Sequence, residues 1–307
     1  MINITDELIK NIKEKDNPTV MGLDPVFSYI PEGILKNNRI DASNESIEET
    51  NINVPEAFLE FNKELIDSVC DVIPAVKPNL AFYEAYGYKG VKAFEDTCTY
   101  AKEKGMVVIS DGKRNDIGST AEAYARAYFS NIDNVDMLTV NGYLGEDGIN
   151  PFVDVSETLG YKKGIFVLVK TSNKSSGQLQ DLKLENGNEL YLEVASLVNE
   201  WNEKTKGENG YGVVGAVVGA TYKEQLEILR KAMPSSYILI PGYGAQGGTA
   251  EDIAVGFNED GLGAIVNSSR GLMCAYKKDK YAGQTLKEAA RAEAIHMRDD
   301  LNSVIKK

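Results

Sequence analysis

Eight short apolar runs, separated by stretches of helical character, constrain the fold of this 307-residue chain more than any other feature. Runs of this kind are typical of strands that are buried on both faces of a parallel sheet. They cover residues 19–25, 74–79, 107–110, 137–141, 164–170, 213–219, 237–242 and 263–268. Between them, the pattern predicts helices at about residues 3–15, 55–71, 89–104, 120–129 and 221–233.

An alternation of eight strands with helices is typical of the (β/α)8 (TIM) barrel, an α/β fold that we expect as a single domain over residues 1–307. A doubly wound open sheet is the alternative. No GxGxxG follows the first strand, which weakens the dinucleotide-binding form of that alternative. Residues 36–54 are rich in Asn, Ser and Glu, and we interpret them as a polar insertion at the surface.

Composition and charge exclude several classes of protein. The net charge of −13 argues against nucleic acid or an anionic membrane as a partner. No apolar run has the length of a transmembrane helix, and the polar N-terminus lacks the apolar region of a signal peptide. Cys70, Cys98 and Cys274 are far apart and odd in number, so we expect reduced thiols in a cytoplasmic protein. With His296 as the only histidine, we expect neither a Ser-His-Asp triad nor a metal site.

Charged side chains follow the first three predicted strands directly. Asp24 ends the first run and Lys77 the second, while Asp111 and Lys113 follow the third. Residues two apart in a strand share a face, so Asp111 and Lys113 should point the same way. The carboxyl ends of the strands meet at one mouth of a barrel, which is where such barrels carry their chemistry. A salt-bridge cluster at the surface is the alternative interpretation.

Beyond the third strand, the chain turns into a predicted helix. Asp116 lies in this turn. Ser119 and Glu122 have the spacing of a capping box, in which each side chain bonds to an unpaired N–H group of the first helical turn. We therefore expect the helix to start at Thr120.

Two loops carry the features of a phosphate site. Residues 241–249 (PGYGAQGGT) are rich in glycine and precede a predicted helix, so their N–H groups can converge on an anion. Arg270, after the eighth strand, offers a planar guanidinium suited to bidentate phosphate binding. In (β/α)8 barrels, phosphates are frequently bound by the loops after strands seven and eight. A flexible turn is the alternative for the glycine-rich loop taken alone.

The loop after the fifth strand, residues 171–179 (TSNKSSGQL), is rich in hydroxyl and amide groups. Such groups can bind the polar edge of a base or a sugar. A mobile loop in solvent has the same composition, so both interpretations stand at this point.

Four motifs together resemble the orotidine 5′-phosphate decarboxylase family, and most closely its longer bacterial type 2 branch. They are Asp111-x-Lys113-x-x-Asp116, Lys77-Pro78-Asn79, Thr171-Ser172-Asn173 and the glycine-rich residues 241–248. The first motif alone also marks sugar-phosphate relatives in the same superfamily, whereas the combination is much more specific. The likeness extends from about residue 22 to residue 271.

This resemblance implies a (β/α)8 homodimer that needs no cofactor and converts orotidine 5′-phosphate to UMP and CO₂ in de novo pyrimidine biosynthesis. It implies that Lys113 protonates a C6 carbanion that is stabilised electrostatically, that Asp111 lies beside the substrate carboxylate, and that Lys77 completes the charge network. Asp116 and Thr120 would reach across the dimer interface to the ribose in the partner's site. The resemblance also implies that Asp24 and Asn79 bind the substrate, with Asp24 on the ribose, and that Thr171 or Ser172 contacts the pyrimidine. The phosphate would be held by Gln246, by the N–H groups of Gly247 or Gly248, and by Arg270.

Three alternatives to this function remain open at this point. One is a Mg²⁺-dependent sugar-phosphate lyase or synthase of the same superfamily, whose activity EDTA would abolish. Another is an aldolase that forms a Schiff base through Lys77 or Lys170, which borohydride would trap. The last is a non-catalytic barrel that binds a phosphate-bearing ligand without turnover.

Overall fold

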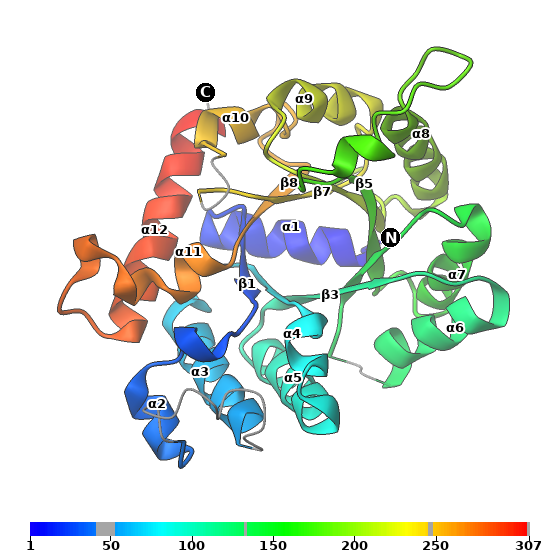
Figure 1. Cartoon of the computed structure of the whole chain (residues 1–307). Helices are drawn as coiled ribbons and strands as arrows, with labels where there is room; N and C mark the ends of the chain where they lie inside the picture. The colour runs from blue at the N-terminus through cyan, green and yellow to red at the C-terminus, as the bar shows by residue number, and fades with distance from the viewer. Residues whose placement is uncertain (41–52, 132–133, 245–247, 306–307) are drawn as a thin grey trace.

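The computed structural model describes residues 1–40, 53–131, 134–244 and 248–305. In these ranges, eight parallel strands form a closed barrel in the order of the sequence, and β8 pairs with β1 to complete it (Figure 1). The predicted (β/α)8 barrel is confirmed, and the open-sheet alternative is wrong. The strands are β1 Thr19–Leu23, β2 Ala75–Pro78, β3 Val107–Arg114, β4 Met137–Val140, β5 Gly164–Lys170, β6 Val214–Val218, β7 Ile238–Pro241 and β8 Ala264–Ser268.

Helices surround the barrel (Figure 1). The predictions for residues 3–15, 55–71 and 89–104 agree with α1, α3 and α5 to within two residues at each end. The α-helices are α1 Ile4–Lys15, α2 Glu32–Asn37, α3 Val54–Val69, α4 Leu80–Glu84, α5 Gly87–Glu103, α6 Gly118–Arg126, α7 Asn150–Thr158, α8 Leu190–Asn202, α9 Lys223–Ala232, α10 Ala250–Ala254, α11 Arg270–Met273 and α12 Leu286–Ile305.

The capping box predicted from Ser119 and Glu122 is wrong. Helix α6 begins at Gly118, and its N-cap residue, Ile117, makes no capping hydrogen bond through its side chain. Gly118 has a φ of +52°, a left-handed conformation that glycine adopts without steric cost. Helix α6 therefore begins within this turn, ahead of both Ser119 and Glu122.

The amino-terminal helix α1 closes one end of the barrel. Asn11 donates a hydrogen bond to the carbonyl of Gly105, which precedes β3, and Lys15 donates to the carbonyl of Ile73, which precedes β2. Leu8, in the middle of the helix, is completely buried. Figure 1 shows α1 lying across the ring of strands. Since α1 covers the amino-terminal ends of the strands, the carboxyl ends form the open mouth.

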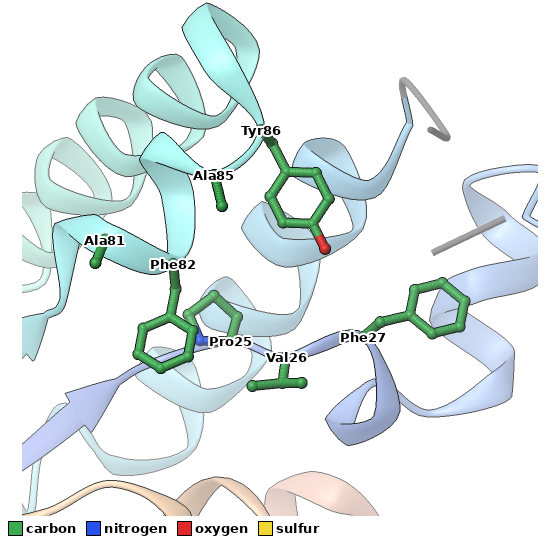
Figure 2. A pocket seen from close by; sticks show the side chains of 7 residues that line it. All are labelled: Pro25, Val26, Phe27, Ala81, Phe82, Ala85 and Tyr86. Carbon is green, nitrogen blue, oxygen red and sulfur yellow. The ribbon is translucent and has the colours of Figure 1, made fainter. Parts of the chain in front are cut away.

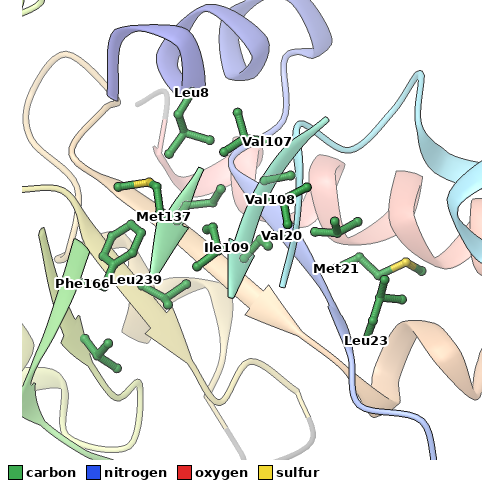
Figure 3. Close-up of a cluster of buried hydrophobic side chains, with 14 of the residues drawn as sticks. Leu8, Val20, Met21, Leu23, Val107, Val108, Ile109, Met137, Phe166 and Leu239 are labelled. Atoms are coloured by element: carbon green, nitrogen blue, oxygen red, sulfur yellow. The ribbon is translucent and has the colours of Figure 1, made fainter. Parts of the chain in front are cut away.

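Apolar side chains fill the barrel between α1 and the mouth (Figure 3). Val107 and Ile109 of β3, Met137 of β4, Phe166 of β5 and Leu239 of β7 are at most 2% exposed. Successive residues of a strand point to opposite faces, so the alternate residues of these runs face the surrounding helices. The interior is thus a packed core, and polar groups that continue the inward-facing series emerge at the carboxyl ends of the strands.

Most of the predicted polar insertion at residues 36–54 lies outside the described residues, which omit 41–52. At its borders, α2 ends at Asn37 and α3 begins at Val54. In the described ranges, no helix is both long enough and apolar enough to span a membrane.

Candidate active site

Three charged side chains meet at the carboxyl ends of β2 and β3. Asp111 forms an ion pair with Lys77 through Oδ2 at 2.8 Å and with Lys113 through Oδ1 at 2.5 Å. The side chains of Lys77 and Asp111 are only 6% and 10% exposed, whereas that of Lys113 is 49% exposed. The structure therefore brings these three predicted residues together, with one lysine enclosed and the other accessible.

The end of β3 departs from a regular strand, and this departure positions Lys113. The pairing of β3 with β4 shifts in register between Ser110 and Arg114, and Lys113 has a φ of +45°. The hydroxyl of Thr139, on β4, accepts a hydrogen bond from the Lys113 N–H at 3.0 Å and donates one to Asp111 Oδ1 at 2.9 Å. A side-chain-bearing residue persists in this left-handed region only where its surroundings hold it, commonly at functional sites.

The charges support one another electrostatically. Burial disfavours the charge on Asp111, but attraction to Lys77 and Lys113 outweighs burial and lowers the pKa of this carboxyl below its usual range. Burial also acts to lower the pKa of Lys77, yet attraction to Asp111 and Asp24 leaves that pKa above its ordinary value. Asp24 Oδ1 is buried without a hydrogen-bond partner among the described residues. The site thus holds Asp111 and Lys77 ionised, and it leaves a buried oxygen of Asp24 without a hydrogen-bond partner among the described residues.

A cavity of about 460 Å³ opens beside these charges. Leu168, Val217 and Leu239 contribute apolar walls from β5, β6 and β7. Thr171 and Ser172, from the loop after β5, contribute hydroxyl groups. Apolar walls with a few converging polar groups are typical of sites for small molecules. The hydroxyl-rich loop therefore lines the site, as the ligand-binding interpretation of residues 171–179 requires.

Three other predicted substrate contacts occupy different positions. Asn79 follows β2, is half-buried, and caps α4 by accepting a hydrogen bond from the N–H of Ala81. Asp116 accepts a hydrogen bond from the N–H of Ile117, and Thr120 is exposed on α6. Neither Asp116 nor Thr120 lines the cavity formed by its own chain.

The two loops predicted to hold a phosphate begin side by side, because Pro241 of β7 pairs with Asn267 of β8. Arg270 is the first residue of α11 and is exposed. Its side chain makes no hydrogen bond or ion pair with any residue in the described ranges. Its guanidinium is therefore available to an anion at this end of the barrel.

The glycine-rich loop leads into α10, as predicted, and Thr249 caps that helix. The N–H of Gly248 donates to the carbonyl of Gly242 at 3.4 Å, so this predicted phosphate donor is engaged within its own loop here. The predicted phosphate contacts Gln246 and Gly247 lie outside the described residues.

Lys170, one of the two lysines considered for a Schiff base, does not line the cavity. Its side chain is 2% exposed and pairs with Asp181 at 2.6 Å. Its ammonium also lies 5.7 Å and 5.3 Å from the ring centroids of Tyr191 and Tyr222. An enclosed ammonium with an ionic partner is a poor nucleophile, so this geometry favours a structural role for Lys170.

Two polar residues that line the cavity were missed in the sequence. Thr139 lies two residues after the inward-facing Met137, so strand alternation carried a signal for it. Gln180 lies in a loop, and no periodicity or motif marks it. Among the described residues, no group of three or more His, Cys, Asp or Glu side chains is arranged to hold a metal ion.

Comparison with known proteins assigns the chain to a family. The sequence profile described as "Orotidine 5'-phosphate decarboxylase / HUMPS family" matches residues 49–285. This chain belongs to that family. A Rhodopirellula baltica protein named orotidine 5'-phosphate decarboxylase is 42% identical to it, over 98% of this chain and 99% of that protein. A Clostridium acetobutylicum protein of the same name is 38% identical, over 98% of this chain and all of that protein.

Solved structures agree with this family assignment. The Leishmania donovani OMP decarboxylase structure superimposes with a TM-score of 0.74 at 29% identity, covering 100% of both chains. The structure of Leishmania donovani UMP synthase gives a TM-score of 0.75 at 31% identity. That match covers 99% of this chain and 57% of the UMP synthase chain.

The lowered pKa of Asp111 predicts how stability depends on pH. A carboxyl whose pKa is lower in the folded protein contributes stability above its unfolded pKa, and that contribution is lost as the pH falls towards the folded value. We expect the unfolding free energy of the wild type, measured by urea denaturation, to fall more steeply from about pH 5 to about pH 2 than that of Asp111→Asn. The exposed Asp147 provides the control variant Asp147→Asn, which should retain the wild-type slope. Equal slopes in all three proteins would contradict the prediction.

Proposed function

We propose that this protein decarboxylates orotidine 5′-phosphate to UMP and CO₂, the reaction of de novo pyrimidine biosynthesis for which its closely similar relatives are named. The observation that carries the proposal is the Lys77–Asp111–Lys113 array at the mouth of the barrel. The array lies beside a cavity of suitable size for a small molecule, in a chain of this family.

The array suits the chemistry of this reaction. Loss of CO₂ from C6 of the pyrimidine leaves a localised carbanion with no adjacent carbonyl to delocalise the charge. The ammonium of Lys113, held by Asp111 and half exposed, can stabilise that charge and then donate a proton to C6. Asp111 would lie beside the substrate carboxylate, whose repulsion is relieved as CO₂ leaves. Lys77, the enclosed lysine of the array, helps to keep Asp111 ionised through their ion pair.

In this proposal, no metal ion or cofactor takes part. Both carboxylate oxygens of Asp111 are already occupied by ammonium groups, at 2.8 Å and 2.5 Å, so this carboxylate is poorly placed to act as a ligand to a divalent cation. Asp24 would contact the ribose, Asn79 would also bind the substrate, and Thr171 or Ser172 would contact the pyrimidine edge. Arg270 would hold the phosphate together with the glycine-rich loop, to which Gln246, Gly247 and Gly248 belong.

We extend the proposal to a homodimer in which each active site is shared. Asp116 and Thr120 lie outside the cavity of their own chain, and Ile117 beside them is 51% exposed. A two-fold interface is isologous, so each chain would both contribute and receive the same residues. An interface that buries Ile117 would carry Asp116 towards the ribose in the partner's site.

An apolar hollow next to the site supports this dimer. It measures about 610 Å³ and lies between the segment after β1 and helix α4 (Figure 2). The residues that line it come shortly after Asp24 and Asn79 in the sequence. Its lining residues are Pro25, Val26, Phe27, Ala81, Phe82, Ala85 and Tyr86. An exposed apolar hollow beside a polar site is typical of a surface that another protein covers.

Three finer assignments complete the proposal. The length of the chain and its motif combination favour the type 2 branch of the family, with one domain over residues 1–307 and an insertion near 36–54. Cys70, Cys98 and Cys274 are all free, which favours a reducing, cytoplasmic location. We expect the nucleotide substrate and a second copy of the chain as partners, and neither nucleic acid nor a membrane.

The first test of the function is the loss of orotidine 5′-phosphate absorbance with purified protein in EDTA. We expect turnover to persist in the chelator and to be abolished by Lys113→Ala, because that variant lacks the proton donor while Asp111 keeps its bond to Lys77. Circular dichroism should show that the variant is folded. Loss of wild-type activity in EDTA would favour the Mg²⁺-dependent alternative, and ordinary turnover by Lys113→Ala would refute the mechanism.

The second test concerns Arg270. Arg270→Ala should lower kcat/KM for the phosphorylated substrate by about 10- to 100-fold, as expected for loss of a charged hydrogen bond. The same variant should hardly change the reaction of a truncated substrate without the phosphate. Equal losses on both substrates would show that Arg270 acts on another part of the reaction.

The third test is complementation between subunits. Lys113→Ala and Asp116→Ala should each be inactive as homodimers. After subunit exchange, about half of the dimers are mixed, and each mixed dimer has one site with an intact Lys113 and an intact Asp116, so activity should return to roughly a quarter of the wild type. An affinity tag on one variant verifies that mixed dimers have formed. Mixed dimers without activity would show that Asp116 serves its own chain.

A further inference from the structure

The side chain of Gln180 lines the cavity and bonds to Thr171 twice. Its Oε1 accepts a hydrogen bond from the Thr171 N–H at 3.0 Å, and its Nε2 donates to Thr171 Oγ1 at 2.8 Å. The two residues are nine positions apart, so the loop after β5 returns to its own first residue. One amide group therefore holds both the backbone and the hydroxyl of Thr171.

These two bonds determine the direction of the hydroxyl proton. A backbone N–H can only donate, so the oxygen of the Gln180 amide must face it, and the amide NH₂ must then face Thr171 Oγ1. The Thr171 hydroxyl consequently accepts from Gln180 and donates its own proton onward. The acceptor is Asn173 Oδ1 at 2.6 Å, which leaves the Asn173 amide NH₂ to donate to Ser175 at 3.0 Å.

This chain of hydrogen bonds leaves the hydroxyls of Thr171 and Ser172 unequal. The Thr171 proton is committed to Asn173, so this hydroxyl cannot donate to a ligand without breaking the chain. The Ser172 hydroxyl makes no hydrogen bond with any residue in the described part of the chain, and Ser172 lines the same cavity. Ser172 is therefore the hydroxyl that can adapt to a base, as a donor or as an acceptor.

Two further contacts hold this edge of the cavity. The neighbour of Gln180, Asp181, forms the ion pair with the enclosed Lys170 at 2.6 Å, which ties the returning loop to the end of β5. On the other side, Gly219 lies so close to Ser172 that a Cβ atom there would come within 3.0 Å of its backbone. The ion pair of Asp181 therefore restrains the loop at Gln180, and the close contact with Gly219 restrains Ser172 on the other side.

Resting on the function proposed above, we infer that Gln180 is a positioning residue for pyrimidine recognition. It sets the direction of the Thr171–Asn173 hydrogen bond, so that this edge presents one pattern of donors and acceptors to the base, next to the adaptable hydroxyl of Ser172. Uracil and cytosine have opposite patterns at N3 and the exocyclic group on C4. The consequence is a preference for UMP over CMP that depends on the amide of Gln180.

The test compares the binding of UMP, CMP and ribose 5-phosphate to wild type, Gln180→Ala and Gln180→Glu by calorimetric titration. A glutamate can accept from both the N–H and the hydroxyl of Thr171, which anchors the loop but reverses the hydroxyl proton. Both variants should reduce the preference for UMP over CMP by about tenfold, with unchanged affinity for ribose 5-phosphate. Gln178→Ala, an exposed glutamine in the same loop, should behave like the wild type.

Two results would overturn the inference. One is a wild-type ratio of UMP to CMP affinity in Gln180→Glu; the other is an equal loss of affinity for all three ligands, which indicates a role in loop structure alone. If Gln180→Ala fails to fold, the glutamate variant decides between these outcomes. Absence of orotidine 5′-phosphate turnover in the wild type would refute the proposed function, while the UMP and CMP affinities would still report on Gln180.

Discussion

A buried carboxylate held between two ammonium groups is the interaction on which the rest of this site depends. Removing Asp111 from water costs several kcal/mol unless the charge is paired and hydrogen-bonded, and here Lys77, Lys113 and Thr139 supply those partners. The two lysines differ in exposure, 6% against 49%, so one stabilises the charge while the other reaches the cavity. The left-handed backbone at Lys113 is tolerated because these contacts hold it in place.

The barrel gives this ionic group its surroundings. Helix α1 covers the amino-terminal ends of the strands, and the packed interior separates it from the mouth. The cavity walls of Leu168, Val217 and Leu239 continue that apolar interior up to the charges. In such a setting, fixed charges act more strongly on a bound ligand than they would in water, because little solvent is present to screen them. The ionic group thus lies at the carboxyl ends of the strands, because α1 closes the barrel at their amino-terminal ends.

Opposite the charges, the loop after β5 forms a second rigid edge of the cavity. Lys170 does not line the cavity and forms an ion pair with Asp181, which makes it an anchor for the loop. Gln180 then returns to the first residue of the loop and bonds its backbone and hydroxyl. The loop therefore carries ordered donors and acceptors, although its composition is also that of a mobile solvent loop. A charged edge and a neutral polar edge therefore face the same cavity.

The sequence by itself determined the barrel and the inward direction of its main charged residues. Apolar runs that are continuous must be buried on both faces, and eight of them alternating with helices close into a barrel. Alternation along the strands placed Asp111 in line with Val107 and Ile109, at the end where Lys77 also emerges. Motif resemblance added the family and the residues of its active site as expectations, and the comparisons with known proteins confirm the family.

Only the tertiary structure decided how these residues are held. The backbone N–H of Lys113, within the register shift of β3, donates to a hydroxyl of β4. Gln180 bonds to Thr171 because the loop returns across nine residues. The sequence pattern also failed to predict the start of α6, which lies at Gly118, ahead of the capping box expected from Ser119. Local periodicity reports which way a side chain points from its own element. Hydrogen bonds between separate segments depend on the distance and angle at which those segments meet, which periodicity does not encode.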